Sequence, residues 1–142
     1  CLLDSLKKRV NFLEETFALL KLENITAIHG RAEEFAKNKA YREQYDLCVS
    51  RAVSNLATLS EYCLPYVKVG GNFISYKSGT VQEELQQAEK AVKILGGKIQ
   101  DVVYFNLPDS EIQRSLVVIE KMKPTPGRYP RKAGTPLKEP LS

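Results

Sequence analysis

The sequence predicts an α/β fold built on a mostly parallel sheet with helices on both faces. Short apolar runs typical of buried strands alternate with amphipathic runs at helical spacing, in the order β-α-β-α-β-α-β-α-β-β. Strand–helix–strand units of this kind require right-handed crossovers, which favours parallel neighbours. A chain of 142 residues with 43% hydrophobic and 27% charged residues has the size and composition of one globular domain.

Each strand and helix in the first half has its own pattern. Apolar residues recur every three or four positions in the first helix and form one face: Leu6, Val10, Leu13, Phe17 and Leu20. From such patterns we expect strands at residues 1–3, 25–29 and 46–50 and helices at residues 6–20, 32–37 and 55–64.

The second half begins with a glycine pair and ends with a hairpin. Gly70-Gly71 predicts a turn into a strand, and Gly96-Gly97 closes the helix that follows this strand. The last two strands have only a short turn between them, so they must pair antiparallel. We expect strands at residues 72–76, 98–107 and 114–121 and a helix at residues 81–95.

The end of the chain is basic and rich in proline. Residues 121–142 contain six Lys or Arg residues, one Glu and five of the seven prolines, whereas residues 1–120 are close to neutral. Proline lacks a backbone N–H and fixes φ, so we predict neither a helix nor an inner strand here. Two interpretations stay open: a solvated extended terminus, or an arm that binds the phosphates of nucleic acid. We therefore divide the chain into a domain at residues 1–123 and an arm at residues 124–142.

Several classes of protein and site are disfavoured. The longest apolar runs hold four residues, whereas a membrane-spanning helix needs about 20. The three cysteines, Cys1, Cys48 and Cys63, show no CxxC spacing, so we expect buried reduced thiols in a cytoplasmic protein. His29 is the single histidine, which gives little support to a zinc site or a Ser–His–Asp triad. The chain starts at Cys1 and its one methionine is Met122, so we expect a piece of a longer protein.

Ligands of open α/β sheets bind beside the carboxyl ends of the strands, so these ends hold the candidate site residues. Asp4 ends the first strand, where a carboxylate can either accept hydrogen bonds from ribose hydroxyls or cap the next helix. After the second strand, the loop at residues 30–34 can offer backbone N–H groups and a carboxylate to the edge of a base. The alternative is that Glu33 and Glu34 have no ligand and only stabilise the start of a helix.

Cations end the next two strands. Arg51 follows the third strand and Lys77 lies at the end of the fourth, and with the basic tail they predict a positively charged mouth for a phosphate-rich substrate. The sequence has no GxGxxG or GxxxxGKS/T loop, although a glycine-rich loop normally follows the first strand of a nucleoside-binding sheet. The first strand of this chain therefore corresponds to the second of such a sheet. We expect a gap or an exposed edge where the other strand belongs.

Four stretches carry a resemblance to a known family: Leu-Asp-Ser-Leu-Lys-Lys-Arg at residues 3–9, Gly-Arg-Ala-Glu-Glu at 30–34, Asp-Leu-Cys-Val-Ser-Arg-Ala-Val at 46–53, and Tyr-Pro-Arg-Lys-Ala-Gly-Thr-Pro-Leu-Lys-Glu-Pro-Leu at 129–141. In this order and along essentially the whole chain, they resemble the bacterial RsmG/GidB family. That family methylates N7 of a guanine in 16S ribosomal RNA with S-adenosyl-L-methionine. The resemblance implies a class I S-adenosylmethionine-dependent methyltransferase (Rossmann-like) sheet whose first strand is missing from this chain.

The resemblance also implies roles for individual residues. Asp4 falls at the ribose position, Ala32 and Glu33 at the contact with the adenosine part, and Arg51 beside the cofactor. Arg51 and Lys77 are the candidate catalytic residues, with Arg51 as a positioning or charge-complementing group. The residues implied on the RNA side are Arg31, Lys77, Arg128, Arg131, Lys132 and Lys138. The implied partner is 16S ribosomal RNA or the small ribosomal subunit, and we expect a monomer without a metal.

One departure from the family is large. Its glycine-rich cofactor loop and N-terminal helical segment are absent from this sequence, so we expect this piece to be inactive alone. The same departure leaves open a second function, a non-catalytic RNA-binding or ribosome-assembly module. A nucleotide-dependent dehydrogenase on a related sheet is disfavoured by the antiparallel final hairpin and by the tail.

Overall fold

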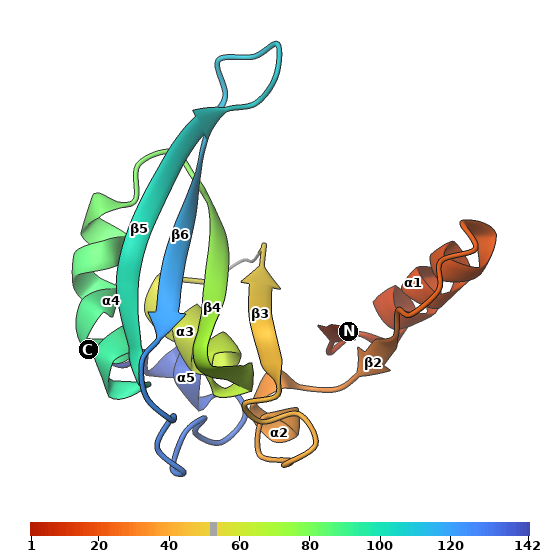
Figure 1. Cartoon of the computed structure of the whole chain (residues 1–142), viewed down its shortest axis with the longest axis horizontal. Coiled ribbons are helices and arrows are strands. Elements are labelled where there is room, and N and C mark those ends of the chain that lie inside the picture. Colours follow the sequence, from red (N-terminus) through yellow and green to blue (C-terminus); the bar gives the residue numbers. More distant parts are fainter. Residues whose placement is uncertain (52–53) are drawn as a thin grey trace.

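The computed structural model describes residues 1–51 and 54–142 and contains two separate sheets (Figure 1). The predicted order of strands and helices is confirmed, with a short 3-10 helix (η1) and a last short helix added. The elements are β1 (Leu2–Asp4), α1 (Lys7–Leu19), β2 (Ala27–His29), α2 (Ala32–Phe35), β3 (Tyr45–Ser50), α3 (Leu56–Cys63), η1 (Leu64–Tyr66), β4 (Val67–Ser78), α4 (Gln82–Ile94), β5 (Gly97–Asn106), β6 (Gln113–Lys121) and α5 (Thr135–Lys138).

The strands pair in parallel near the start of the chain and antiparallel near its end. β1 and β2 form a parallel pair, and the larger sheet has the order β3-β4-β6-β5. β3 and β4 are parallel, whereas β6 is antiparallel to both β4 and β5. The antiparallel final hairpin is therefore confirmed. The prediction of a mostly parallel sheet is wrong for the described pairings. Strand β6 lies between β4 and β5 and runs antiparallel to both, so two of the three pairings in the larger sheet are antiparallel.

The core lies between the four-stranded sheet and the helices α3 and α4. Phe73 of β4 and Ile119 of β6 are register partners on the inner face, and both are fully buried against this helix pair. On the outer face of the same sheet, Val49 of β3 and Tyr76 of β4 are about half exposed. The expectation of helices on both faces is therefore wrong for this sheet within the described residues. Helix α1 packs on β1 and β2 instead.

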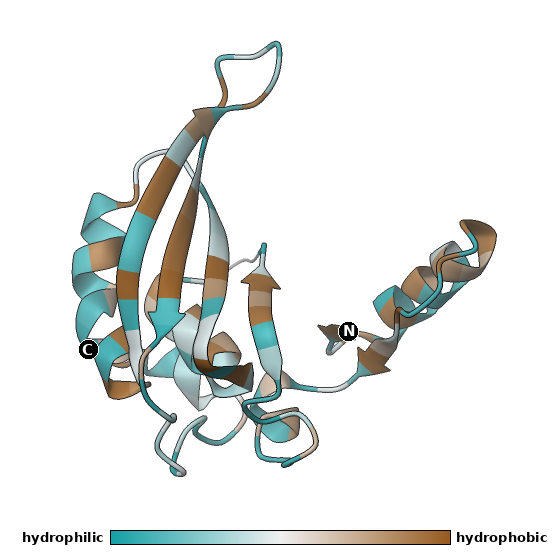
Figure 2. Ribbon diagram, viewed as in Figure 1, coloured by the Kyte–Doolittle hydropathy of each residue, from teal (hydrophilic) through white to brown (hydrophobic). Residues whose placement is uncertain are grey.

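The N-terminal unit, residues 2–29, lies to one side of the four-stranded sheet (Figure 1). The predicted bounds of α1 are close to the observed ones, but of its apolar face only Val10 is buried. On this face Leu6 and Leu20 are 52% and 60% exposed and Leu13 and Phe17 are half-buried, while Phe12 and Leu19, which lie off the face, are 66% and 82% exposed. Figure 2 shows hydrophobic residues along α1, and this helix packs on β1 and β2, two strands of three residues each. The amphipathic pattern predicted the helix correctly, but the apolar residues at the two ends of the predicted face, Leu6 and Leu20, stay exposed.

The two glycine pairs behave differently. Gly96 has a φ of 88° just after α4, as expected for a helix C-terminus. Gly70 and Gly71 do not form the predicted turn, because β4 runs through them from Val67 to Ser78. A Cβ atom on Gly71 would lie 2.5 Å from the carbonyl oxygen of Asp46 on β3. Gly71 therefore allows the close approach of two neighbouring strands.

The C-terminal segment, residues 124–142, folds back on the body of the protein. Thr125, Tyr129 and Pro136 are buried, so of the two interpretations that the sequence left open, the solvated, extended terminus is wrong. The prediction that no helix forms here is also wrong, since α5 places Pro136 in its first turn, where a missing N–H costs nothing. The division of the chain at residue 124 into domain and arm stays a prediction.

Candidate functional site

A cavity of about 910 Å³ separates the N-terminal unit from the edge strand β3. We call it the β1–β3 cavity. It is lined from the carboxyl ends of β1 and β3, from α2 and from the C-terminal segment, by residues that include Asp4, Ser5, Arg31, Ala32, Glu33, Ser50, Ser54, Gly134 and Leu137. The expected gap in the sheet is thus present: among the described residues, β1 pairs with β2 and β3 with β4, and the two sheets are not joined.

Asp4 stabilises the turn that leads into α1. Its Oδ1 accepts a hydrogen bond from the backbone N–H of Leu6 at 2.8 Å, and its Oδ2 accepts one from Arg9 Nη1 at 3.3 Å. The N-cap residue of α1 is Leu6 and no side chain caps this helix, so the alternative of Asp4 as the helix cap is wrong; its contacts stabilise the turn before the helix. A carboxylate has about four acceptor sites, so Asp4 retains capacity toward the cavity that it lines. Its role at a ribose stays a prediction.

The start of α2 is tied to two distant parts of the chain. The carbonyl oxygen of Ala32 accepts a hydrogen bond from the Tyr66 hydroxyl at 2.7 Å. Glu33 is buried, and its Oε1 accepts a hydrogen bond from the backbone N–H of Gly134 at 2.9 Å. Burial raises the pKa of Tyr66 well above its ordinary value, so this hydroxyl remains a hydrogen-bond donor. Both α2 residues that the sequence singled out are therefore held in place at the cavity wall.

Arg51 and Lys77 lie at different places beside this region. Arg51 is exposed directly after β3, and the next two residues of its motif, 52 and 53, lie outside the described residues. The Lys77 side chain is only 9% exposed, and its Nζ donates to Glu84 Oε1 at 2.6 Å and to the Ser54 carbonyl at 2.8 Å. Its charge is therefore already neutralised by α4. The catalytic roles of both residues, the cofactor contact of Arg51 and the RNA contact of Lys77 stay predictions.

The cations of the C-terminal segment fall into two groups. Arg128, Lys132 and Lys138 are exposed, and the Arg128 guanidinium lies 5.0 Å from the centroid of the Tyr129 ring. Arg131 instead forms an ion pair with Glu61, with Nη2 2.7 Å from Oε2. The sequence placed all four on the RNA side, and the structure directs Arg131 toward the protein.

Comparison with known proteins decides the family. The profile described as GidB, rRNA small subunit methyltransferase G, matches residues 1–117. The chain belongs to the GidB family. Ribosomal RNA small subunit methyltransferase G of Lachnoclostridium phytofermentans is 56% identical over 140 residues, which cover 99% of this chain and 58% of that protein. The chain thus spans about 58% of the length of this GidB relative.

Solved structures show the same fold at low identity. An rRNA methylase of Streptococcus thermophilus matches with a TM-score of 0.58 and 17% identity, over 85% of this chain and 72% of that one. M. jannaschii TYW2, solved in complex with AdoMet, matches with a TM-score of 0.59 and 13% identity, over 84% and 57%. The GidB chain therefore has an α/β fold of the S-adenosylmethionine-dependent methyltransferase type.

Sequence reasoning missed Arg42, which connects the α2 region with the C-terminal segment. Its Nη1 donates to the carbonyl oxygens of Ala36 at 3.1 Å and Tyr129 at 2.9 Å. Its Nη2 donates to the carbonyl oxygens of Thr125 at 2.7 Å and Pro126 at 3.4 Å. A single arginine in a loop carries no sequence pattern that would have predicted four carbonyl partners.

Lys121 is a second missed residue, and here a signal existed. Val117, Ile119 and Lys121 alternate along β6, so all three lie on its inner face. The Lys121 side chain is 0% exposed, and its Nζ lies 2.7 Å from the Leu64 carbonyl and 3.2 Å from Glu43 Oε1. Burial lowers the pKa of Lys121, and the contact with Glu43 partly offsets this. The period of two in β6 could have identified this lysine as buried.

The cysteines are free, as expected, but not all are buried. Cys63 is buried, Cys48 is half-buried, and both line the β1–β3 cavity. A hydrogen bond with Cys48 and burial raise the pKa of the Cys63 thiol. Cys1 is exposed, so the expectation of buried thiols is wrong there.

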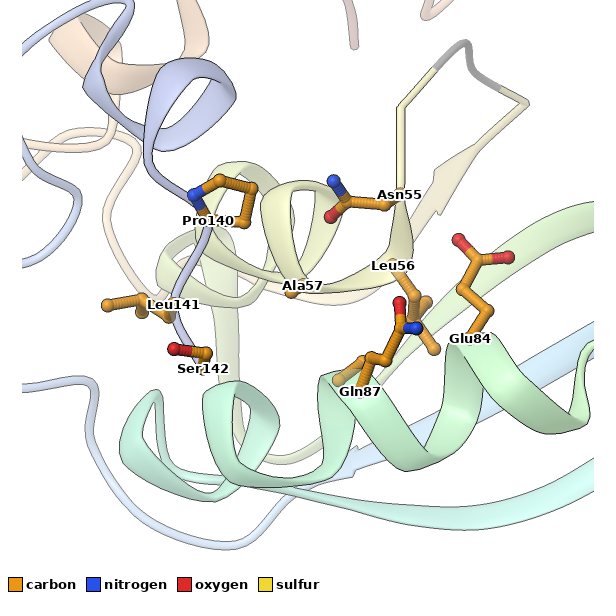
Figure 3. A pocket seen from close by; sticks show the side chains of 9 residues that line it. Asn55, Leu56, Ala57, Glu84, Gln87, Pro140, Leu141 and Ser142 are labelled. Carbon is orange, nitrogen blue, oxygen red and sulfur yellow. The ribbon is translucent and has the colours of Figure 1, made fainter.

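A smaller cavity of about 250 Å³ lies between α3, α4 and the last residues of the chain (Figure 3). Asn55, Glu84, Gln87 and Ser142 supply polar side chains, and Pro140 and Leu141 line the side of the C-terminal segment. Across the residues that the structure describes, no group of three metal-ligating side chains occurs, and no helix is long and apolar enough to cross a membrane.

Proposed function

We propose that the protein containing this chain methylates N7 of a guanine in 16S ribosomal RNA, with S-adenosylmethionine as the methyl donor. Membership of the GidB family supports the activity, and one structural observation carries the proposal for the site. The β1–β3 cavity collects Asp4, Ala32 and Glu33 from two separate strand ends at one wall. The space for the further strand proposed below forms part of this cavity, so the total volume of about 910 Å³ is larger than the cofactor site itself.

The residues present fit a nucleoside cofactor. The buried Ser54 hydroxyl lines the cavity and has no hydrogen-bond partner among the described residues, so it is available to a ligand. Asp4 would accept hydrogen bonds from the ribose hydroxyls, and Ala32 and Glu33 would contact the adenosine part. When bound, S-adenosylmethionine supplies a methyl group on a positively charged sulfur.

Methyl transfer to N7 of guanine requires alignment of the two reactants and no general base. N7 of guanine carries a lone pair on the major-groove edge and has no proton to lose before it attacks. The protein then acts by holding the base in line with the donor and by complementing charge. We assign this positioning role to Arg51, which follows β3 at the carboxyl edge of the sheet. The exposed cations Arg31, Arg128, Lys132 and Lys138 would bind RNA phosphates near the cavity.

We also propose that a further strand fills the space between β1 and β3. β3 presents an unpaired edge within the described residues, and Leu47 and Val49 on it are about half exposed. A strand between two parallel neighbours would satisfy both edges and bury this apolar surface. The resulting order would be β2-β1-strand-β3-β4-β6-β5, with the cofactor loop beginning at the carboxyl end of the added strand.

The test uses Arg51→Ala in the complete natural protein. We expect methyl transfer from labelled S-adenosylmethionine to unmethylated small-subunit RNA to fall on the order of 100-fold, with unfolding by urea unchanged. Lys90→Ala, which removes an exposed cation from α4, is the matched control and should keep full transfer. Near-normal transfer by Arg51→Ala would contradict the assignment. RNA binding by the wild-type protein without any binding of S-adenosylhomocysteine would instead favour the non-catalytic RNA-binding module.

A further inference from the structure

We propose that residues 131–137 of the C-terminal segment form one wall of the cofactor site and that the Arg131–Glu61 ion pair sets the position of this wall. Arg131 is then a positioning residue for the cofactor and does not contact RNA phosphates. The inference rests on the proposed function, because it takes the β1–β3 cavity as the place of S-adenosylmethionine.

The attachment of the segment to α3 is strong. Glu61 is a residue of α3 whose side chain is 1% exposed. Its carboxylate accepts four hydrogen bonds from Arg131: from the backbone N–H at 2.7 Å, from Nε at 3.0 and 3.1 Å, and from Nη2 at 2.7 Å. Side-on contacts between a guanidinium and a carboxylate fix direction as well as distance. A buried carboxylate with this many donors holds the chain at residue 131 in one place.

A second contact fixes the segment on the other side of Gly134. The Thr58 hydroxyl donates to the carbonyl oxygen of Pro136 at 2.9 Å, and both residues are buried. Thr58 and Glu61 are three residues apart in α3, so they lie on the same side of this helix. Arg131 also donates from Nη2 to the carbonyl oxygen of Glu139 at 2.7 Å. Helix α3 therefore holds the loop around Gly134 at both of its ends.

The loop held in this way reaches the cavity. Gly134 and Leu137 line it, together with Glu33. The Gly134 N–H donates to Glu33 Oε1 at 2.9 Å, and Gly134 has a φ of 84°, which a residue with a Cβ rarely adopts. The backbone of the segment thereby orients the carboxylate that we assign to the adenosine part of the cofactor. The hydrogen bonds of Arg131 with Glu61 and of Gly134 with Glu33 are joined by the backbone of residues 131–134, and together they link α3 to Glu33.

The neighbouring cation offers a built-in comparison. Lys132 is exposed and adjacent to Arg131, yet it lies on the solvent side of the segment. If both cations served RNA, removing either would weaken RNA binding in the same way. If residues 131–137 form a wall of the cofactor site, removing Arg131 weakens cofactor binding, whereas removing Lys132 weakens RNA binding.

The experiment compares Arg131→Ala and Lys132→Ala in the complete natural protein, with calorimetry of S-adenosylhomocysteine binding and RNA binding at several salt concentrations. Arg131→Ala should raise the Kd for S-adenosylhomocysteine about tenfold and leave the salt dependence of RNA binding unchanged. Lys132→Ala should keep the wild-type Kd for S-adenosylhomocysteine and lower the slope of log K against log salt by about one. Unchanged S-adenosylhomocysteine binding by Arg131→Ala, with weaker and less salt-dependent RNA binding, would overturn the inference.

Two controls separate this inference from its premises. Absence of S-adenosylhomocysteine binding by the wild-type protein would contradict the proposed function itself, before any variant is compared. Should Arg131→Ala fail to fold, as judged by circular dichroism, Arg131→Lys takes its place, since lysine keeps the charge but lacks the planar fork. We expect Arg131→Lys to bind S-adenosylhomocysteine about threefold more weakly than wild type. Wild-type affinity in this folded variant would equally overturn the inference.

Discussion

The N-terminal unit (residues 2–29) and the C-terminal segment (residues 124–142) attach to the body of the protein in opposite ways. The N-terminal unit has a well-formed helix, yet Phe12 and Leu19 remain exposed on it. The C-terminal segment has little regular structure, yet buried side chains of α3 hold it on both sides of Gly134. Regular secondary structure and firm attachment are thus independent properties in this chain.

The reason is that apolar surface needs a matching surface, whereas a polar segment needs matching donors and acceptors. Helix α1 packs on two strands of three residues each, which offer little area. The C-terminal segment meets a buried carboxylate, a buried hydroxyl and the guanidinium of Arg42, each of which requires a partner once it leaves water. Proline in the segment lowers the entropy of its unfolded state and so favours the docked conformation.

Breaking the Glu61 contact should have the largest effect on stability. Glu61→Ala leaves the donors of Arg131 without their partner and a void beside α3, and we expect a loss of about 3 kcal/mol in the free energy of unfolding in urea. Glu89→Ala removes an exposed carboxylate from α4 and should change the free energy by less than about 0.5 kcal/mol. A loss below about 1 kcal/mol for Glu61→Ala would mean that the segment is attached no more firmly than by a surface ion pair.

Lys121 should come next, because it supports the start of the C-terminal segment. Its partner Glu43 also accepts a hydrogen bond from the Thr125 N–H at 2.8 Å. Lys121→Met removes the hydrogen bonds from Nζ to the carbonyl oxygens of Leu64 and Val67 and leaves Glu43 without its cation, and we expect a loss of about 2 kcal/mol in urea at neutral pH. Lys90→Met, on the exposed side of α4, is the control and should be close to neutral.

The pH dependence of the free energy of unfolding, compared between wild type and Lys121→Met, gives a second test. Burial lowers the pKa of Lys121 below its ordinary 10.5, so the unfolded chain binds this proton more tightly than the folded protein does. Stability therefore rises with pH between the folded pKa and 10.5. The advantage of wild type over Lys121→Met should grow as the pH approaches 10.5. A constant difference across this range would show that the lysine has the same pKa in both states.

The N-terminal unit should give the smallest effect. Leu19 is 82% exposed at the end of α1, so Leu19→Lys in the 142-residue chain should change the free energy of unfolding by less than about 0.5 kcal/mol. The measurement is the same urea titration. A loss above about 1 kcal/mol would mean that this end of α1 is covered in solution, and the contrast with the C-terminal segment would then disappear.

Local patterns predicted most of the fold. Periods of two and of three to four residues located the strands and helices, and the shared edge of parallel strands brought Asp4, Ala32 and Glu33 to one cavity. The prediction of a turn at Gly70-Gly71 was wrong because a glycine can also allow two strands to approach closely. Here the neighbour is the backbone of Asp46 on another strand, which the local sequence does not reveal. Insertion of β6 between β4 and β5 likewise depends on pairing across the sheet and leaves no local pattern.

The contact between Arg131 and Glu61 shows where sequence reasoning about the site ends. Glu61 stands in a helix whose other residues are almost all buried, which indicates a buried carboxylate in need of a cation. The sequence contains 21 Lys and Arg residues, and periodicity cannot choose among them. The partner is Arg131, 70 positions further along the chain, and the folded C-terminal segment brings it to Glu61.

That separation along the chain has a consequence for synthesis. Glu61 is made 70 residues before Arg131, and Glu33 is made 101 residues before Gly134. A chain growing from its N-terminus therefore holds α3 with an uncompensated carboxylate, and α2 without its donor, until the last part of this sequence has left the ribosome. Closing such long loops is slow compared with forming helices and hairpins. Within this sequence, the residues that line the cavity from the C-terminal segment are made after β6, so a chain interrupted after β6 would hold β1 to β6 but lack Gly134 and Leu137 at the cavity.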